Sequence, residues 1–113
     1  SDAAIQSDLD GIRTQAQLYF GDHSNSYGSN VVLESNCAAM DNLFNDATIA
    51  KQVAGANTAN GSSANVTCNV AGGGTAYAVS AALVSTPSTY YCVDSLGTGT
   101  TTTSALGATA TSC

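Results

Sequence analysis

The hydrophobic pattern at the start of the chain is that of an amphipathic helix. Polar residues separate apolar ones that recur at alternating steps of four and three, the spacing of one helix face. The pattern predicts a helix from about residue 2 to residue 20, ended by Gly21 and the polar residues after it. A helix with one apolar stripe must pack on another element. The stripe consists of Ile5, Leu9, Ile12, Ala16 and Tyr19.

Helical spacing returns after a polar, turn-forming stretch from Gly21 to Asn36. We predict a second helix from about residue 41 to residue 54, opened by Asp41 as its N-cap and closed by Gly55. Its apolar positions are Leu43, Phe44, Ala47, Ala50 and Val53 or Ala54.

Beyond the Asn60-Gly61 turn the period changes from helical to strand-like. Residues 76–84 and 89–94, AYAVSAALV and TYYCVD, predict two antiparallel strands joined by a loop that contains Pro87. Residues 97–113 are almost entirely Thr, Ser, Gly and Ala. Within them, residues 100–103 have strand propensity, although the composition equally allows coil.

Composition and charge exclude several classes of function. The chain has 113 residues, enough for one compact domain over 1–113. Only Arg13 and Lys51 are basic and the net charge is −6, which disfavours nucleic-acid binding and adhesion to anionic lipid. The sequence contains no run of about 18 apolar residues, so it predicts neither a membrane span nor a signal peptide within these residues. Because the first residue is Ser1 and not Met, we expect processing or an upstream segment.

Four cysteines indicate structural disulfides and an oxidising, extracytoplasmic compartment. No pair has the C-x-x-C spacing of a zinc or redox site. Four cysteines allow three pairings, and the spacing alone does not choose among them. The cysteines are Cys37, Cys68, Cys92 and Cys113.

The sequence offers no candidate catalytic site. His23 lies in a turn beside Asp22 and Ser24, and adjacent residues rarely assemble a triad, so we interpret it as an exposed turn histidine. Residues 72–74, three glycines, lack the spacing and the following Lys of a phosphate loop, and we expect a flexible connection. We therefore predict that the protein is not an enzyme and carries no cofactor.

Binding chemistry is equally sparse in the sequence. A calcium site built on Asp41 and Asp46 is a weaker alternative to helix capping by Asp41. Asn60 and Asn65 each begin an N-glycosylation pattern, which short Asn- and Thr-rich chains also contain by chance. The aromatic pairs 19–20 and 90–91 are candidates for a ligand platform, with packing as the simpler interpretation.

The segments SDLDGIRTQAQLYF, GTAYAVSAALV and YYCVDSLG occur in this order along the chain, and together they resemble the bacterial type IV pilin and pseudopilin family. SDLDGIRTQAQLYF, followed by a Gly-Asp turn, is similar to the exposed half of the family's long N-terminal helix. GTAYAVSAALV and YYCVDSLG resemble its sheet strands. The resemblance spans most of the chain. It implies an α+β fold in which the helix packs on an antiparallel sheet of three to four strands. The family's apolar inner half-helix is absent from this chain, and calcium ligands near the C-terminus do not carry over, since Asp94 is the only acidic residue after Asp46.

The resemblance implies a structural subunit of an extracellular filament, serving adhesion, motility, DNA uptake or secretion. Its expected partners are copies of itself or other pilins, together with inner-membrane assembly machinery. Before assembly, the missing half-helix would anchor it to the membrane. A monomeric secreted module that binds a surface ligand through polar loops is the alternative. We favour the pairs Cys37–Cys68 and Cys92–Cys113, because the second would pin the polar tail to a strand and because a closing disulfide near the C-terminus resembles the pilin pattern.

Overall fold

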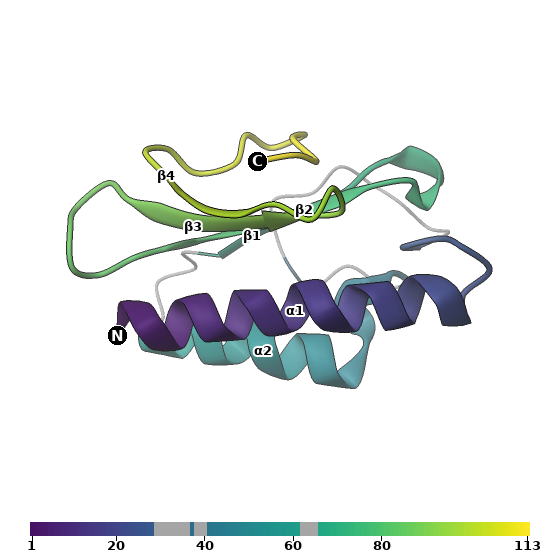
Figure 1. The fold of residues 1–113 in the computed structure, drawn as a ribbon, viewed down its shortest axis with the longest axis horizontal. Coiled ribbons are helices and arrows are strands. Elements are labelled where there is room, and N and C mark those ends of the chain that lie inside the picture. The colour runs from purple at the N-terminus through teal and green to yellow at the C-terminus, as the bar shows by residue number, and fades with distance from the viewer. Residues whose placement is uncertain (29–36, 38–40, 62–65) are drawn as a thin grey trace.

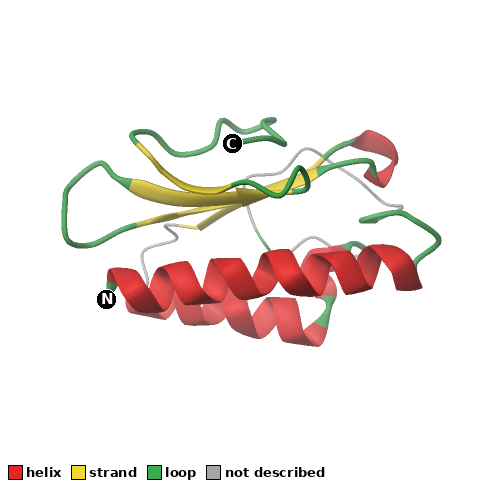
Figure 2. Cartoon of the chain, viewed as in Figure 1, coloured by secondary structure: helices red, strands yellow, loops and turns green. Residues whose placement is uncertain are grey.

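The computed structural model describes residues 1–28, 37, 41–61 and 66–113. Two helices lie on one face of a four-stranded antiparallel sheet, and the C-terminal segment, residues 103–113, lies on the other face (Figures 1 and 2). This arrangement confirms the expected α+β class with an N-terminal helix on a small sheet. The elements are α1 (Asp2–Asp22), the 3-10 turn η1 (Leu43–Asn45), α2 (Ala47–Ala59), β1 (Val66–Val70), η2 (Gly72–Gly74), β2 (Tyr77–Ala82), β3 (Tyr90–Asp94) and β4 (Gly99–Thr102).

Helix α1 follows the predicted pattern closely. Ser1 caps it, with its hydroxyl oxygen accepting a hydrogen bond from the Ala4 N–H at 3.2 Å. The first turn is also fixed to the β2–β3 loop, because the Asp2 carboxylate accepts hydrogen bonds from the N–H groups of Val84 and Ser85. Of the predicted stripe, Ile5, Leu9, Ile12 and Ala16 are buried and Tyr19 is half-buried.

The predicted second helix was wrong in its start, its cap and its end. Residues 43–45 form the turn η1, and α2 begins only at Ala47. Its N-cap is Asp46, whose carboxylate accepts from the N–H groups of Thr48 and Ile49, whereas Asp41 has a left-handed backbone with φ 61°. Gly55 lies inside α2, at a point where α1 passes too close for a side chain. A Cβ there would lie 2.6 Å from Asp8 Oδ2.

The sheet is a meander in the order β1-β2-β3-β4, with every neighbouring pair antiparallel. The predicted pair of strands is present as β2 and β3. Strand β4 shows that the Thr-rich stretch is a strand rather than coil. Strand β1, VTCNV, was not predicted, because two of its five residues are polar.

The three glycines of η2 are a close-packing site as well as a connection. Gly73 and Gly74 have positive φ, 81° and 70°. The Gly74 carbonyl accepts a hydrogen bond from the Tyr27 N–H at 2.9 Å, and a Cβ on Gly74 would lie only 2.4 Å from the Gly28 carbonyl oxygen. The backbone at residue 74 thus approaches the backbone at residues 27–28 too closely for any side chain.

The core lies between the helices and the inner face of the sheet. Alternation along the strands points one set of apolar residues at α1 and α2. The disulfides join Cys37 to Cys68 and Cys92 to Cys113, the two pairs favoured from the sequence. The sheet side of the core consists of Val66, Cys68, Val70, Tyr77, Val79, Ala81 and Val93, all buried.

Candidate functional site

The predicted helix face is part of the core. Ile5, Leu9, Ile12 and Ala16 have no exposed surface, and Tyr19 is half-buried against the same cluster. Burying a leucine or isoleucine side chain is worth about 1.5 to 3 kcal/mol. This face therefore holds α1 on the sheet and is not available to a ligand or to another subunit.

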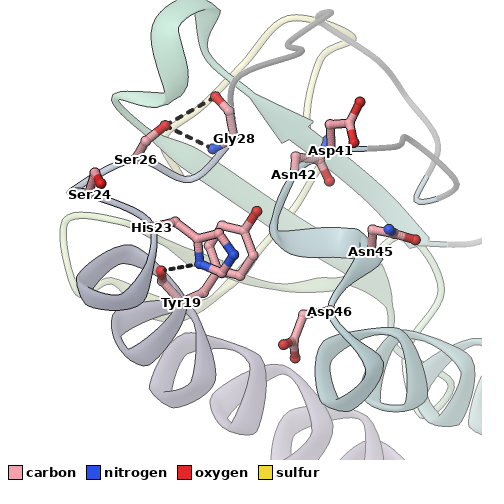
Figure 3. Close-up of a pocket in the computed structure, with 9 residues that line it drawn as sticks. All are labelled: Tyr19, His23, Ser24, Ser26, Gly28, Asp41, Asn42, Asn45 and Asp46. Atoms are coloured by element: carbon pink, nitrogen blue, oxygen red, sulfur yellow. Dashed lines mark hydrogen bonds between the residues drawn. The ribbon is translucent and has the colours of Figure 1, made fainter.

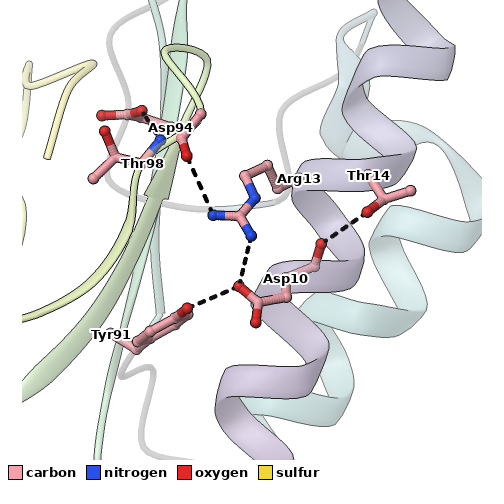
Figure 4. Close-up of polar contacts among 7 residues, drawn as sticks. Asp10, Arg13, Thr14, Tyr91, Asp94 and Thr98 are labelled. Atoms are coloured by element: carbon pink, nitrogen blue, oxygen red, sulfur yellow. Dashed lines mark hydrogen bonds and ion pairs between the residues drawn. The ribbon is translucent and has the colours of Figure 1, made fainter.

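A polar network fixes α1 to the sheet beside that face (Figure 4). The Tyr91 hydroxyl on β3 donates a hydrogen bond to Asp10 Oδ1 at 2.8 Å. Arg13 Nη2 lies 3.3 Å from the same oxygen, and Arg13 Nη1 donates to the Gly97 carbonyl at 3.4 Å. Burial raises the pKa of Tyr91, and its bond to Asp10 raises it further. Because Asp10 and Arg13 are partly exposed, their ion pair is worth at most about 1 kcal/mol.

The outer face of the sheet, which points away from the helices, carries buried polar side chains. We define this outer face by Asn69 on β1, Ser80 on β2 and Asp94 on β3, which are 0%, 1% and 1% exposed. Their strand neighbours face the core. Polar residues on the solvent side of a sheet are normally exposed, but here the C-terminal segment covers them (Figure 1).

Of the three outer-face side chains, Asp94 accepts the most backbone hydrogen bonds. Its Oδ1 accepts hydrogen bonds from the N–H groups of Leu96 and Thr98, each at 3.0 Å, and its Oδ2 accepts from the Cys113 N–H at 2.8 Å. Burial acts to raise the pKa of Asp94, but the backbone donors of Cys113, Thr98 and Leu96 outweigh burial, so that this pKa lies below its ordinary value. The carboxylate is thus kept charged by backbone dipoles.

A cleft of about 570 Å³ opens between the end of α1 and the start of α2. We call it the Tyr19 cleft (Figure 3). Tyr19 and His23 stack in it, with ring centroids 3.6 Å apart and planes 11° apart. Burial is the largest cause that raises the pKa of Tyr19, and the Asp46 and Asp41 carboxylates raise it further. The lining residues are Tyr19, His23, Ser24, Ser26, Gly28, Asp41, Asn42, Asn45 and Asp46.

The chemistry of the Tyr19 cleft suits binding more than catalysis. His23 Nδ1 donates a hydrogen bond to the Tyr19 carbonyl oxygen at 2.8 Å, and the Ser24 hydroxyl lies away from the His23 ring (Figure 3). Among the described lining residues, no nucleophile, base and orienting group converge. These residues supply hydroxyls, amides and two carboxylates and include no lysine or arginine, so they favour neutral polar or cationic groups over anions.

The remaining sequence candidates have structural roles or lie outside the described residues. Asp46 caps α2, and the glycines of η2 permit close packing. Asn60 is 7% exposed and its Nδ2 donates to the Ala82 carbonyl at 3.1 Å, which disfavours it as a glycosylation acceptor. Asn65 lies outside the described residues. Of the aromatic pairs, Phe20 packs against Tyr27 with ring centroids 4.6 Å apart.

Sequence reasoning missed the outer face. Each of its three residues is a polar position in a short strand, and such positions normally face solvent. The only signal was the following stretch of small and polar residues, which needs a surface to lie on. No sequence pattern states that it lies on this one.

Comparisons with protein-family models, with curated proteins and with solved structures find no match for this chain. Within the described part of the chain, no helix has both the length and the apolar character needed to cross a membrane. Among the same residues, no group of three or more His, Cys, Asp or Glu side chains is placed to hold a metal ion.

Proposed function

We propose that this chain is the folded head of a subunit of a type IV pilus or a pilus-like extracellular filament, and that it acts by polymerisation. The observation that supports the proposal most is the placement of α1. This helix of 21 residues is the first element of the chain, lies along the sheet, and has its N-terminus at one end of the molecule (Figure 1). An apolar helix upstream of Ser1 would leave the head along the axis of α1 without crossing the fold.

The composition and the disulfides agree with an extracellular filament. Both bridges need an oxidising compartment to form and persist. The head offers few charged groups for strong contacts of its own, so the proposal assigns most of the cohesion to the upstream helix. Copies joined through unlike patches would form an open helical polymer, because heterologous contacts need not close.

The test uses the full gene product in its native host. We expect about 25 apolar residues contiguous with α1, and surface filaments that an antibody against residues 1–113 decorates in electron microscopy. Deletion of the gene should remove the filaments, and a copy with the exposed Leu18 changed to Ser should restore them. A copy with Leu9→Asp should not, since an unpaired charge in the core strongly destabilises the head. A cleavable secretory signal upstream, with monomer in the medium and no decorated filament, contradicts the proposal.

The Tyr19 cleft favours a second candidate function, a secreted binding module. An aromatic pair beside two carboxylates suits a sugar or an organic cation. Titration with a panel of monosaccharides and primary amines, followed by NMR, should then shift the signals of Tyr19 and Asn45. An Asn45→Ala variant should weaken the response. Unchanged spectra across the panel count against this alternative and leave the filament proposal unaffected.

A further inference from the structure

The C-terminal segment is held to the outer face through its main chain. Asn69 Nδ2 donates to the carbonyl oxygens of Gly107 and Ala110, each at 2.8 Å. The Leu106 N–H donates to Ser80 Oγ at 3.3 Å, and Asp94 accepts from the last residue of the segment as described above. These bonds recognise peptide groups and not side chains. The outer face is therefore built to bind the main chain of a segment of small residues that includes the turn from Gly107 to Ala110.

The segment has little else to hold it. Its residues are exposed apart from Leu106, Ala110 and Thr111, which are half-buried, and it forms one internal backbone bond, from the Ala110 N–H to the Gly107 carbonyl. Little apolar area is lost when it detaches, and water can hydrate the polar groups left behind. The Cys92–Cys113 disulfide is the covalent fastening. Cys92 is 1% exposed, whereas Cys113 is exposed.

We propose that the outer face is a peptide-binding site that exchanges its occupant, and that the C-terminal segment of a second copy of this chain can take the place of the chain's own segment. A second copy is the partner that fits, because it presents the same peptide groups at the same spacing and ends in a cysteine that can reach Cys92. Exchange of an identical element is a low-cost route to oligomers. The inference rests on the fold and not on the filament proposal.

Exchange proceeds by thiol–disulfide chemistry with a small thiol such as glutathione. The glutathione thiolate attacks Cys113 Sγ, the Cys92–Cys113 bond breaks, and Cys92 leaves as a thiolate. Cys113 then carries a mixed disulfide with glutathione. The Cys92 thiolate of the second copy attacks Cys113 Sγ and releases the glutathione thiolate, which closes an intermolecular bond. No net oxidation or reduction occurs.

The test mixes equal amounts of unlabelled and ¹⁵N-labelled chain at high concentration in a glutathione redox buffer. After acid quenching and removal of glutathione, the dimer fraction is isolated by gel filtration, digested without reduction and analysed by mass spectrometry. In that fraction about half of the Cys92–Cys113 linked peptides should join a labelled to an unlabelled chain, as random pairing of swapped copies requires. The dimer fraction should grow with protein concentration.

The Cys37–Cys68 bridge is the internal control, since its linked peptides should stay within one chain. Equal mixing at both bridges means general scrambling and overturns the proposal. So does a Cys92–Cys113 bond that reopens and recloses only within one chain, or one that stays closed in the redox buffer. The Cys92→Ser, Cys113→Ser double variant tests exchange without the disulfide. It should show a concentration-dependent dimer by light scattering, and a strict monomer contradicts exchange.

Discussion

Two leucines on the same helix test how α1 is held. Leu9 has no exposed surface, whereas Leu18 is 57% exposed. Truncation of each to Ala removes the same atoms, and neither change harms helix propensity, since Ala is the best helix former. The difference between the two variants therefore reports the packing of the stripe on the sheet.

The structure gives the expected size of the effect. Leu9→Ala leaves a cavity in a closed core and should cost about 2 to 5 kcal/mol of unfolding free energy. The total free energy of unfolding of such a domain is about 5 to 15 kcal/mol. From the unfolding entropy typical of this chain length, the loss should lower the melting temperature by about 10 to 20 °C. Leu18→Ala should stay within about 0.5 kcal/mol of the parent chain.

Thermal and urea unfolding followed by circular dichroism, with both disulfides intact, measures both variants. Leu9→Asp is a harsher version, because it buries an unpaired charge and should cost several kcal/mol of unfolding free energy. Equal melting temperatures for Leu9→Ala and Leu18→Ala would refute the assignment of the stripe to the core. So would an unchanged melting temperature in Leu9→Asp.

Three further predictions concern the backbone and the C-terminal segment. Gly74→Ala should lower stability by about 1 to 3 kcal/mol, because φ is positive and a neighbouring backbone blocks a Cβ, while Gly72→Ala, with open space, should be close to neutral in urea unfolding. Since the folded pKa of Asp94 lies below the ordinary 3.8, its stabilisation is present above that pH and is lost as pH falls through the lower folded value. The NMR protection of the Cys113 amide, its exchange rate relative to an unprotected peptide at the same pH, should fall there, and unchanged protection would contradict this. Non-reducing peptide mapping of the purified protein should find both bridges, and reduction should free the C-terminal segment before the sheet unfolds; free thiols or a different pairing would contradict this.

The local sequence pattern was sufficient to predict the elements whose apolar side chains pack on one neighbouring layer. The stripe of α1 repeats over four turns, β3 contains two tyrosines and a valine, and β2 places Tyr77 and Val79 two residues apart, so each element was recognised from its own residues. The end of α2 was predicted too early because glycine often ends a helix. Gly55 instead lies inside α2, where its lack of a side chain leaves room for Asp8. That contact joins residues far apart in the chain, and no local pattern contains it.

The class of the fold, the amphipathic helix, the central strand pair and the scarcity of basic residues could be predicted from the sequence. These follow from periodicity and composition, which are local or global sums over the chain. The burial of Asn69, Ser80 and Asp94, the packing of η2 against residue 28 and the cleft at Tyr19 became known from the fold. Burial of a polar side chain depends on which distant segment covers it, and hydrogen bonds to a main chain leave no mark on the side chains of the segment that is bound.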